Sequence, residues 1–135
     1  MDLDRELISA AIFGFVGKIR DLHKAGANIE ARNELGGTPL IIAAHNGHTR
    51  AIQLLRERGA KIEARDDSGR TALIHAATRG HDGAIRELLT ERAGIKADVN
   101  AEDKNGMVAF DFWEKDQSKH RDFREILDSL NPTNP

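Results

Sequence analysis

Six histidines are the side chains of this sequence that could most readily hold a metal ion or move a proton. Histidine titrates near neutral pH and is the commonest protein ligand of transition metals. His48 and His81 each follow a glycine and lie 33 positions apart, so we expect them at equivalent places in two structural units. His23, His45 and His120 have none of the short spacings that zinc ligands show. The sequence therefore predicts no metal site.

Catalytic chemistry is not indicated by the remaining polar residues. The sequence has no Gly-x-Ser-x-Gly elbow, no P-loop, no Gly-x-Gly-x-x-Gly fingerprint and no His-Glu-x-x-His motif. Glu30, Glu63 and Glu102 recur at expected turn positions instead of converging on one pocket. His75 stands among apolar residues, where we expect a partly buried ring held by hydrogen bonds. The sequence predicts neither an enzyme nor a cofactor.

The composition excludes several other classes of function. With 135 residues, 39% hydrophobic and 31% charged, the chain fits one folded domain. Its net charge is −2 and its acidic and basic residues are interspersed, so no basic stripe for nucleic acid is present. Cysteine is absent, which removes disulfides and thiolate chemistry and fits a reducing compartment.

The first twenty residues resemble neither a signal peptide nor a membrane span. Acidic residues stand where a signal peptide would carry positive charge. Gly14, Gly17 and Lys18 interrupt the apolar run that follows, far short of the length that crosses a bilayer. We therefore expect a cytoplasmic protein with no membrane contact.

Residues 37–64, GTPLIIAAHNGHTRAIQLLRERGAKIEA, return in altered form at residues 70–101. Many identical residues in the two stretches are 33 positions apart, namely Thr38 and Thr71, Leu40 and Leu73, Ala43 and Ala76, Gly47 and Gly80, and Ile52 and Ile85. A period of this length predicts stacked units that each bury an apolar face against a neighbour.

The Thr-Pro-Leu start at 38–40, the Gly-His pairs, the Gly-Ala-x-Ile-x-Ala tail at 59–64 and the 33-residue period together resemble the ankyrin repeat. The resemblance implies an all-α solenoid of stacked helix–turn–helix units with projecting β-turns. We expect one domain over 1–131 and a disordered tail over 132–135. The expected repeats cover about 1–32, 33–65, 66–102 and 103–131, the outer two being degenerate caps.

Capping residues predict where several helices begin and end. Thr38 is expected as an N-cap with Pro39 at the first helical position, and Gly47 is expected to end that helix. Asp4 is expected to cap the first helix. In the last repeat Val108 replaces the threonine cap, which costs about 1 kcal/mol if no other group compensates.

The third and last repeats depart from the regular pattern. Four residues are inserted around Arg92–Lys96, because Ala60 and Ala97 are 37 positions apart. Gly94 is expected to end the preceding helix, and the insertion to form a surface loop that the fold tolerates. The aromatic last repeat is expected to close the end of the core, with a final helix that carries Phe123, Ile126 and Leu127.

The ankyrin resemblance implies that a partner binds the concave face, which is built from turn tips and the exposed side of each first helix. Leu35 and Met107 are apolar at turn tips, where they either contact a partner or are ordinary exposed side chains. We expect Arg65, Arg70 and Arg79 to cluster in the groove and attract an acidic partner surface. The candidate binding residues are Leu35, His45, Asn46, Arg65, Asp67, Ser68, Arg70, Thr78, Arg79, Lys104 and Met107.

The function implied by the resemblance is protein–protein interaction, as an adaptor or scaffold. Two alternatives remain open: an inhibitor or immunity-like protein that occludes one enzyme, and an assembly chaperone. We expect a monomer whose partner is another protein.

Overall fold

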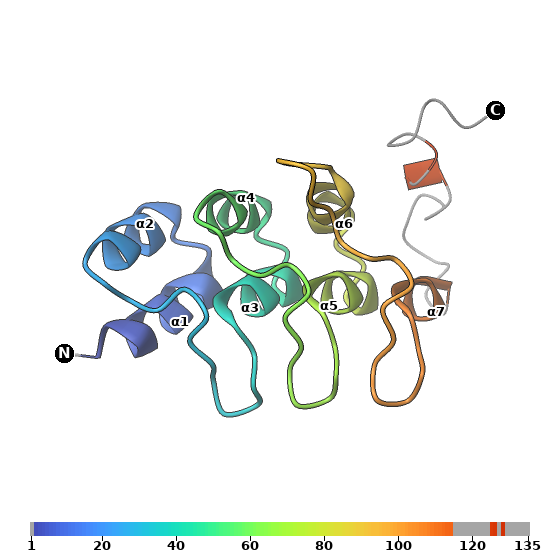
Figure 1. The fold of residues 1–135 in the computed structure, drawn as a ribbon, viewed down its shortest axis with the longest axis horizontal. Coiled ribbons are helices and arrows are strands. Elements are labelled where there is room, and N and C mark those ends of the chain that lie inside the picture. Colours follow the sequence, from blue (N-terminus) through green and yellow to red (C-terminus); the bar gives the residue numbers. More distant parts are fainter. Residues whose placement is uncertain (1, 115–124, 127, 129–135) are drawn as a thin grey trace.

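The computed structural model describes residues 2–114, 125, 126 and 128. In Figure 1, α2, α4 and α6 form one layer, α1, α3, α5 and α7 form the other, and the loops before α3, α5 and α7 project from one side. This arrangement confirms the predicted all-α solenoid with projecting turns. The helices of these residues are α1 (Leu3–Phe13), α2 (Val16–Lys24), α3 (Pro39–His45), α4 (Thr49–Glu57), α5 (Ala72–Thr78), α6 (Asp82–Leu89) and α7 (Ala109–Glu114).

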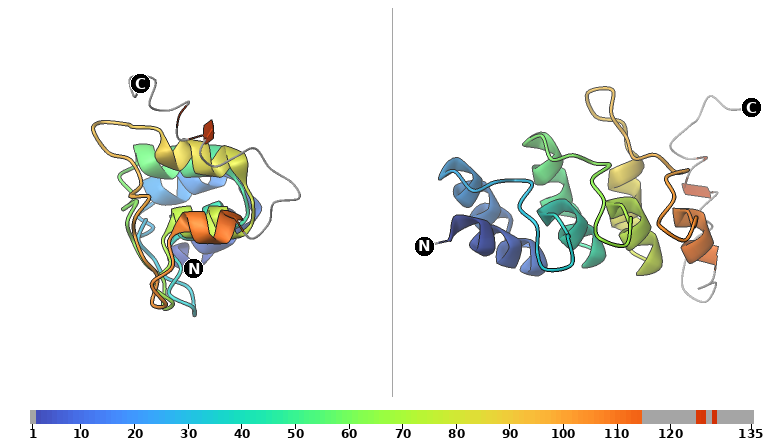
Figure 2. Two further views of the ribbon diagram at one scale, coloured as in Figure 1. Left: turned by 90° about the vertical axis from the view of Figure 1, so that its right-hand side faces the viewer. Right: turned by 60° about the horizontal axis from the view of Figure 1, so that its bottom comes forward.

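The apolar core lies between the two layers and continues from one helix pair to the next (Figure 2). Leu55 of α4 and Leu88 of α6 are fully buried in it. The pairs Ala43-Ala44 and Ala76-Ala77 are also buried, and their small side chains let α3 and α5 pack closely. Each helix pair therefore depends on its neighbours for burial of its apolar face.

The predicted threonine caps are confirmed. Thr38 Oγ1 accepts a hydrogen bond from the backbone N–H of Ile41 at 3.3 Å, and Pro39 is the first residue of α3. Thr71 caps α5 in the same way, through Ile74. Both hydroxyls are buried, so each satisfies a donor that water could not reach.

The predicted cap of α1 is wrong by two residues. Asp2 precedes the helix, and its Oδ1 accepts from the backbone N–H of Arg5 at 3.2 Å. Asp4 lies inside the first turn, where its Oδ1 accepts from the backbone N–H of Asn28 at 2.8 Å. Both carboxylates still suit the positive end of the helix dipole.

The lost threonine cap of α7 is replaced by another side chain. The backbone N–H of Val108 donates to Asp111 Oδ2 at 2.9 Å, the reach-back half of a capping box. Ile126, predicted on the final helix, is fully buried. Phe123, Leu127 and the tail 132–135 lie outside the described residues, so the prediction for them stays a prediction.

The insertion differs from the predicted loop. Helix α6 ends at Leu89, so the prediction that Gly94 ends it is wrong. Arg92 and Ile95 exchange two backbone hydrogen bonds of 2.9 Å around Ala93 and Gly94. Ala93 and Gly94 have φ values of 52° and 78°, as in the two-residue turn of a tight β-hairpin. Glycine serves here as a hairpin residue, because its left-handed conformation carries no steric cost.

The hairpin is also bound to the helices beneath it. Arg92 donates from Nε and Nη2 to the two carboxylate oxygens of Glu87, at 2.6 and 2.8 Å. Arg56 of α4 lies 3.4 Å from the same carboxylate and donates from Nη2 to the carbonyl of Ile95 at 2.9 Å. The insertion therefore takes part in a largely buried ionic network, and the expectation that the fold merely tolerates it as a loop stays a prediction.

Candidate functional site

The three projecting turns are folded by one repeated side-chain position. Asn33, Asp66 and Asp103 each occupy the start of a turn, 33 and 37 positions apart. Each side chain uses Oδ1 to accept two backbone N–H groups of its own turn, at 2.8 to 3.0 Å. This is the Asx arrangement by which a short polar side chain takes the place of a backbone turn partner.

Hydrogen bonds also tie each turn to the next. Arg32 Nη1 donates to the carbonyls of Gly36 and Arg65, at 2.7 and 2.6 Å. Arg65 repeats the pattern one turn later, donating to the carbonyls of Gly69 and Glu102. The turns therefore form a ladder that is ordered before any partner arrives, which lowers the entropy cost of binding.

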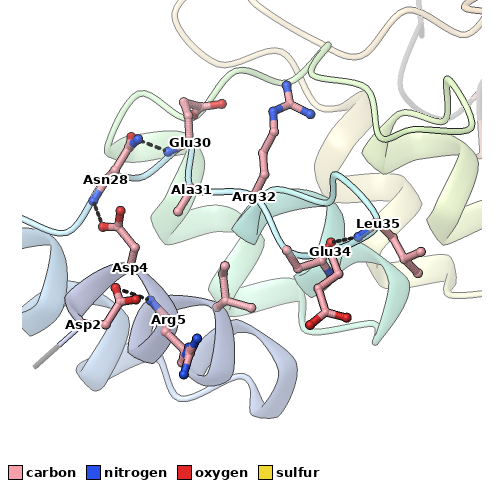
Figure 3. A pocket seen from close by; sticks show the side chains of 11 residues that line it. Asp2, Asp4, Arg5, Asn28, Glu30, Ala31, Arg32, Glu34 and Leu35 are labelled. Atoms are coloured by element: carbon pink, nitrogen blue, oxygen red, sulfur yellow. Dashed lines mark hydrogen bonds between the residues drawn. The ribbon is translucent and has the colours of Figure 1, made fainter.

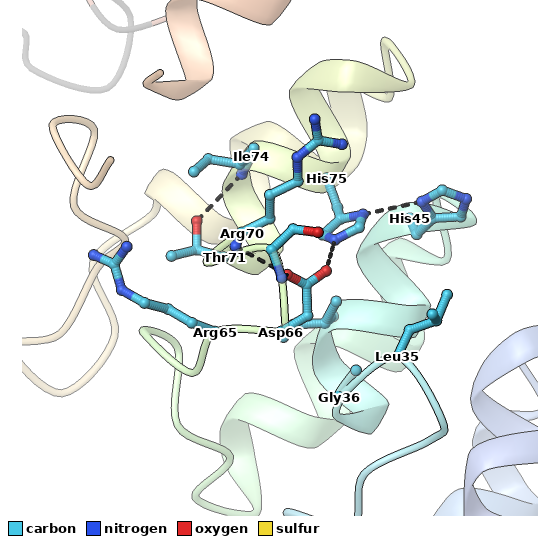
Figure 4. A network of polar contacts seen from close by, with 12 residues as sticks. Leu35, Gly36, His45, Arg65, Asp66, Arg70, Thr71, Ile74 and His75 are labelled. Atoms are coloured by element: carbon cyan, nitrogen blue, oxygen red, sulfur yellow. Dashed lines mark hydrogen bonds and ion pairs between the residues drawn. The ribbon is translucent and has the colours of Figure 1, made fainter. Parts of the chain in front are cut away.

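Two of the three arginines predicted to cluster in the groove, Arg65 and Arg70, have partners within the turns, and their contact with an acidic partner stays a prediction. Arg65 is held by turn carbonyls, and in Figure 4 it points away from Arg70. Arg70 Nε lies 3.6 Å from Asp103 Oδ2, and its guanidinium lies 4.8 Å from the ring centroid of Phe112. Arg79 stays exposed on the first-helix side. Asp103 therefore offsets the charge of Arg70, whereas the carbonyl partners of Arg65 leave its charge in place.

A hollow of about 250 Å³ opens on the concave face between α1, α3, α5 and the first two turns. Its walls are mainly apolar, and its polar side chains come from the C-terminal end of α3, the middle of α5 and the first two turns. The lining residues are Ile12, Asn33, Leu35, Gly37, Ile41, Ile42, His45, Asn46, Asp66 and His75. This volume matches one large side chain rather than a whole helix.

A chain of hydrogen bonds crosses the polar end of this hollow (Figure 4). His75 Nε2 lies 2.7 Å from Asp66 Oδ2, and His75 Nδ1 lies 3.0 Å from His45 Nδ1. Asp66 therefore uses one oxygen to fold its turn and the other to hold His75. We call Asp66, His75 and His45 the relay. The predicted hydrogen-bonded, partly buried His75 is confirmed.

Electrostatics fix the charge of the relay's two ends. Burial acts to raise the pKa of Asp66, but hydrogen bonds from His75 and from the backbone of Arg70 and Ser68 outweigh it, so the pKa is lowered and the carboxylate is ionised at neutral pH. Burial lowers the pKa of His45, and the nearby His75, Arg79 and His81 lower it further. His45 is therefore neutral at physiological pH.

His48 and His81 connect neighbouring repeats. His48 Nε2 bonds to the carbonyl of Ile12 at 2.8 Å, and His81 Nε2 bonds to the carbonyl of His45 at 3.1 Å. These contacts confirm the prediction that the two histidines occupy equivalent structural positions.

The structure brings three predicted binding residues to the hollow and spreads the rest along the groove. Leu35, His45 and Asn46 line the hollow, and Leu35 is 74% exposed. Met107, in the third turn, is partly buried. The other predicted residues that are exposed are Arg65, Asp67, Ser68, Thr78, Arg79 and Lys104. The prediction that these residues contact a partner stays a prediction.

Asp66 is the residue that sequence reasoning missed. Its signal was present, because Asn33, Asp66 and Asp103 recur at the two repeat offsets and His75 follows Asp66 by nine positions. The sequence does not show that the second carboxylate oxygen of Asp66 points to His75.

A second hollow, of about 710 Å³, lies beside the first at the N-terminal end of the groove (Figure 3). Its lining includes four carboxylates and two arginines, and Leu35 lines both hollows. Two of its acids already accept backbone hydrogen bonds, Asp2 from Arg5 and Asp4 from Asn28. Leu35 is therefore the apolar ridge between an acidic hollow and an apolar one.

Metal binding and membrane insertion find no support in the described residues. No group of three or more His, Cys, Asp or Glu side chains is arranged there to hold a metal ion. None of the helices among these residues is long and apolar enough to cross a bilayer.

Comparison with known families agrees with the geometry. Residues 7–103 match the family model of ankyrin repeats, in three copies. No curated relative matches the sequence. The matched segment covers well over half of the chain and contains the first two turns and the relay, so the chain belongs to the ankyrin-repeat family.

Proposed function

We propose that this chain is a protein-binding module that holds its partner on the concave face, at the hollow between the first two turns. Ankyrin repeats are in general protein–protein interaction modules rather than enzymes. The observation that carries the proposal is the exposure of Leu35 above a mainly apolar hollow. Interface cores concentrate apolar side chains of this kind inside a polar rim.

The rim of the proposed interface is polar and retains some positive charge. Arg79 and Lys104 are exposed, whereas Arg65 and Arg70 have partners in the turns. Attraction to an acidic partner surface therefore draws on Arg79, Lys104 and the exposed Arg65, whose hydrogen bonds to neutral carbonyls leave its charge in place. We further propose that the chain acts as a monomer in the cytoplasm, where a protein without cysteine needs no oxidising environment.

A pair of matched substitutions tests the proposal. Leu35→Asp places a negative charge on the ridge of the hollow, and the control Ile95→Asp places one on the insertion hairpin. The two side chains are comparably exposed, at 74% and 56%. Each tagged variant is used to capture proteins from native lysate of the source cell, with quantitative mass spectrometry and circular dichroism as the check of folding. We expect Leu35→Asp to lose a partner that Ile95→Asp retains. Equal capture by both variants would remove the hollow from the interface.

The captured protein also separates the narrower roles. A single enzyme whose activity is abolished stoichiometrically indicates an inhibitor, and two proteins held through separable surfaces indicate an adaptor. A client that is bound only before its assembly is complete indicates an assembly chaperone.

A further inference from the structure

The relay leaves one nitrogen of His45 without a hydrogen-bond partner in the described part of the chain. An ionised carboxylate can only accept, so Asp66 requires the proton of His75 to be on Nε2. In a neutral ring the Nδ1 of His75 is then a lone pair, and it accepts from the Nδ1–H of His45. The remaining nitrogen of His45, Nε2, is consequently unprotonated and can only accept a hydrogen bond.

The ring that carries this acceptor belongs to the lining of the apolar hollow. His45 lines the hollow together with Leu35, Ile41 and Ile42. An aliphatic or plain phenyl side chain that filled this space would desolvate the acceptor without pairing it, which is unfavourable. The complementary group is an apolar ring that carries a single donor.

We propose that the hollow receives a tryptophan side chain of the partner, whose indole N–H donates to His45 Nε2, and that Asp66 and His75 are positioning residues that hold His45 in the accepting tautomer. The inference depends on the proposed function, since the tryptophan belongs to the bound partner. An indole has a wide apolar surface, one donor and no acceptor. A tyrosine hydroxyl also donates, but its oxygen brings a lone pair of its own into the hollow, whereas the indole needs only the acceptor that His45 provides.

The turn provides a clean way to perturb the relay. Asn33 occupies the equivalent place in the first turn and folds it with an amide oxygen, so Asp66→Asn is expected to keep the second turn. The amide N–H₂ would then face His75 Nε2 as a donor and move the proton of His75 to Nδ1. His45 Nδ1 would become the acceptor, and the outward Nε2 of His45 would carry the proton.

The first measurement is the tautomer of His45, read from ring ¹⁵N shifts by NMR at about pH 8, above the ordinary pKa of histidine. We expect an unprotonated Nε2 in the wild-type chain and a protonated Nε2 in Asp66→Asn. Asp103→Asn is the control, because it makes the same exchange at the equivalent position of the third turn, outside the hollow, and it is expected to leave His45 unchanged. A wild-type His45 that carries its proton on Nε2 would overturn the inference.

The second measurement is binding of two small probes, N-acetyltryptophanamide and its analogue methylated at the indole nitrogen, followed by NMR shifts of the Leu35, Ile41 and Ile42 methyl groups. We expect the unmethylated probe to bind about tenfold more tightly, the effect of one hydrogen bond to a buried acceptor. The preference should disappear in Asp66→Asn and in His45→Phe, a variant that leaves every turn hydrogen bond in place.

Each outcome of the probe experiment decides the inference separately from the proposed function. Equal binding of the two probes, tighter binding of N-acetyltyrosinamide, or no methyl shift at saturating probe would overturn the tryptophan assignment. If partner capture still depends on Leu35 in any of these cases, the proposed function stands and only the inference fails. If partner capture does not depend on Leu35 and the probes do not bind, the proposed function and the inference are both refuted.

Discussion

Replacing Glu87 by glutamine tests the claim that the insertion completes a buried ionic network. Glu87 and Arg56 have side chains that are only 9% and 5% exposed, and their charged atoms are 3.4 Å apart. Burial lowers the pKa of Arg56 while Glu87 acts to raise it, so the Glu87 carboxylate stabilises the charged form of the buried guanidinium. Glu87→Gln keeps the shape of the side chain but removes its charge, leaving Arg56 and Arg92 without their shared partner.

The expected magnitude follows from the burial of the pair. Removing one member of a buried ion pair typically costs about 3–5 kcal/mol, and water at the partly exposed Arg92 reduces this to about 2–4 kcal/mol. The total stability of a natural domain is only about 5–15 kcal/mol, so the loss would be large. The matched control is Asp21→Asn, which breaks the 3.8 Å pair with Arg20 on a surface where the side chains are 76% and 48% exposed.

Urea unfolding followed by circular dichroism measures both variants against the wild-type chain. A shift in the midpoint at constant slope reports the change in the free energy of unfolding. We expect a loss of at most about 1 kcal/mol for Asp21→Asn and several times more for Glu87→Gln. If the two losses are equal, the network contributes no more than a surface pair, and the structural role assigned to the insertion is refuted.

Three further predictions use the same assay. Deleting residues 93–96 removes the hairpin carbonyl that accepts from Arg56, and should lower the free energy of unfolding by about 1.5–3 kcal/mol. An unchanged free energy of unfolding would indicate that the insertion is only a tolerated loop. Arg65→Ala should cost about 1–2 kcal/mol because two turn carbonyls lose their donor, while Arg79→Ala, compared by thermal melting, should cost less. The pKa of His45 is lower in the folded than in the unfolded chain. At pH values just below the ordinary pKa of histidine, the unfolded chain therefore binds a proton at His45 that the folded chain does not. Stability should therefore fall between about pH 7 and about pH 5, and His45→Phe should flatten that slope.

The parts of the fold that could be predicted depend on local chemistry. Thr38 and Pro39 fix the start of α3 because a hydroxyl and a missing N–H act on the residues immediately next to them. Gly47 follows the C-cap of α3 and has a φ of 73°, which glycine adopts without strain. A 33-residue period then places the same local structure in the next repeat, as at Thr71.

The features that could not be predicted depend on which groups meet across repeats. An arginine in a turn has several carbonyls within reach, and only the stacking of the turns selects Gly69 and Glu102 for Arg65. The sequence gives the charge of that side chain but not its partner, so Arg65 was assigned to a partner surface. The contacts of the insertion could not be predicted for the same reason, since Glu87 and Arg56 belong to different repeats.

Asx positions at the start of the turns show how this scaffold separates folding from recognition. Asn33, Asp66 and Asp103 do the same work with Oδ1, so the fold needs only one oxygen from each. The second atom is free to differ: Asp66 directs its Oδ2 to His75, and Asp103 directs its Oδ2 toward Arg70. A change between Asn and Asp at these positions can therefore alter the charge and the hydrogen-bonding direction of the groove without altering the turn. The concave face can thus acquire new binding chemistry at positions that the fold also requires.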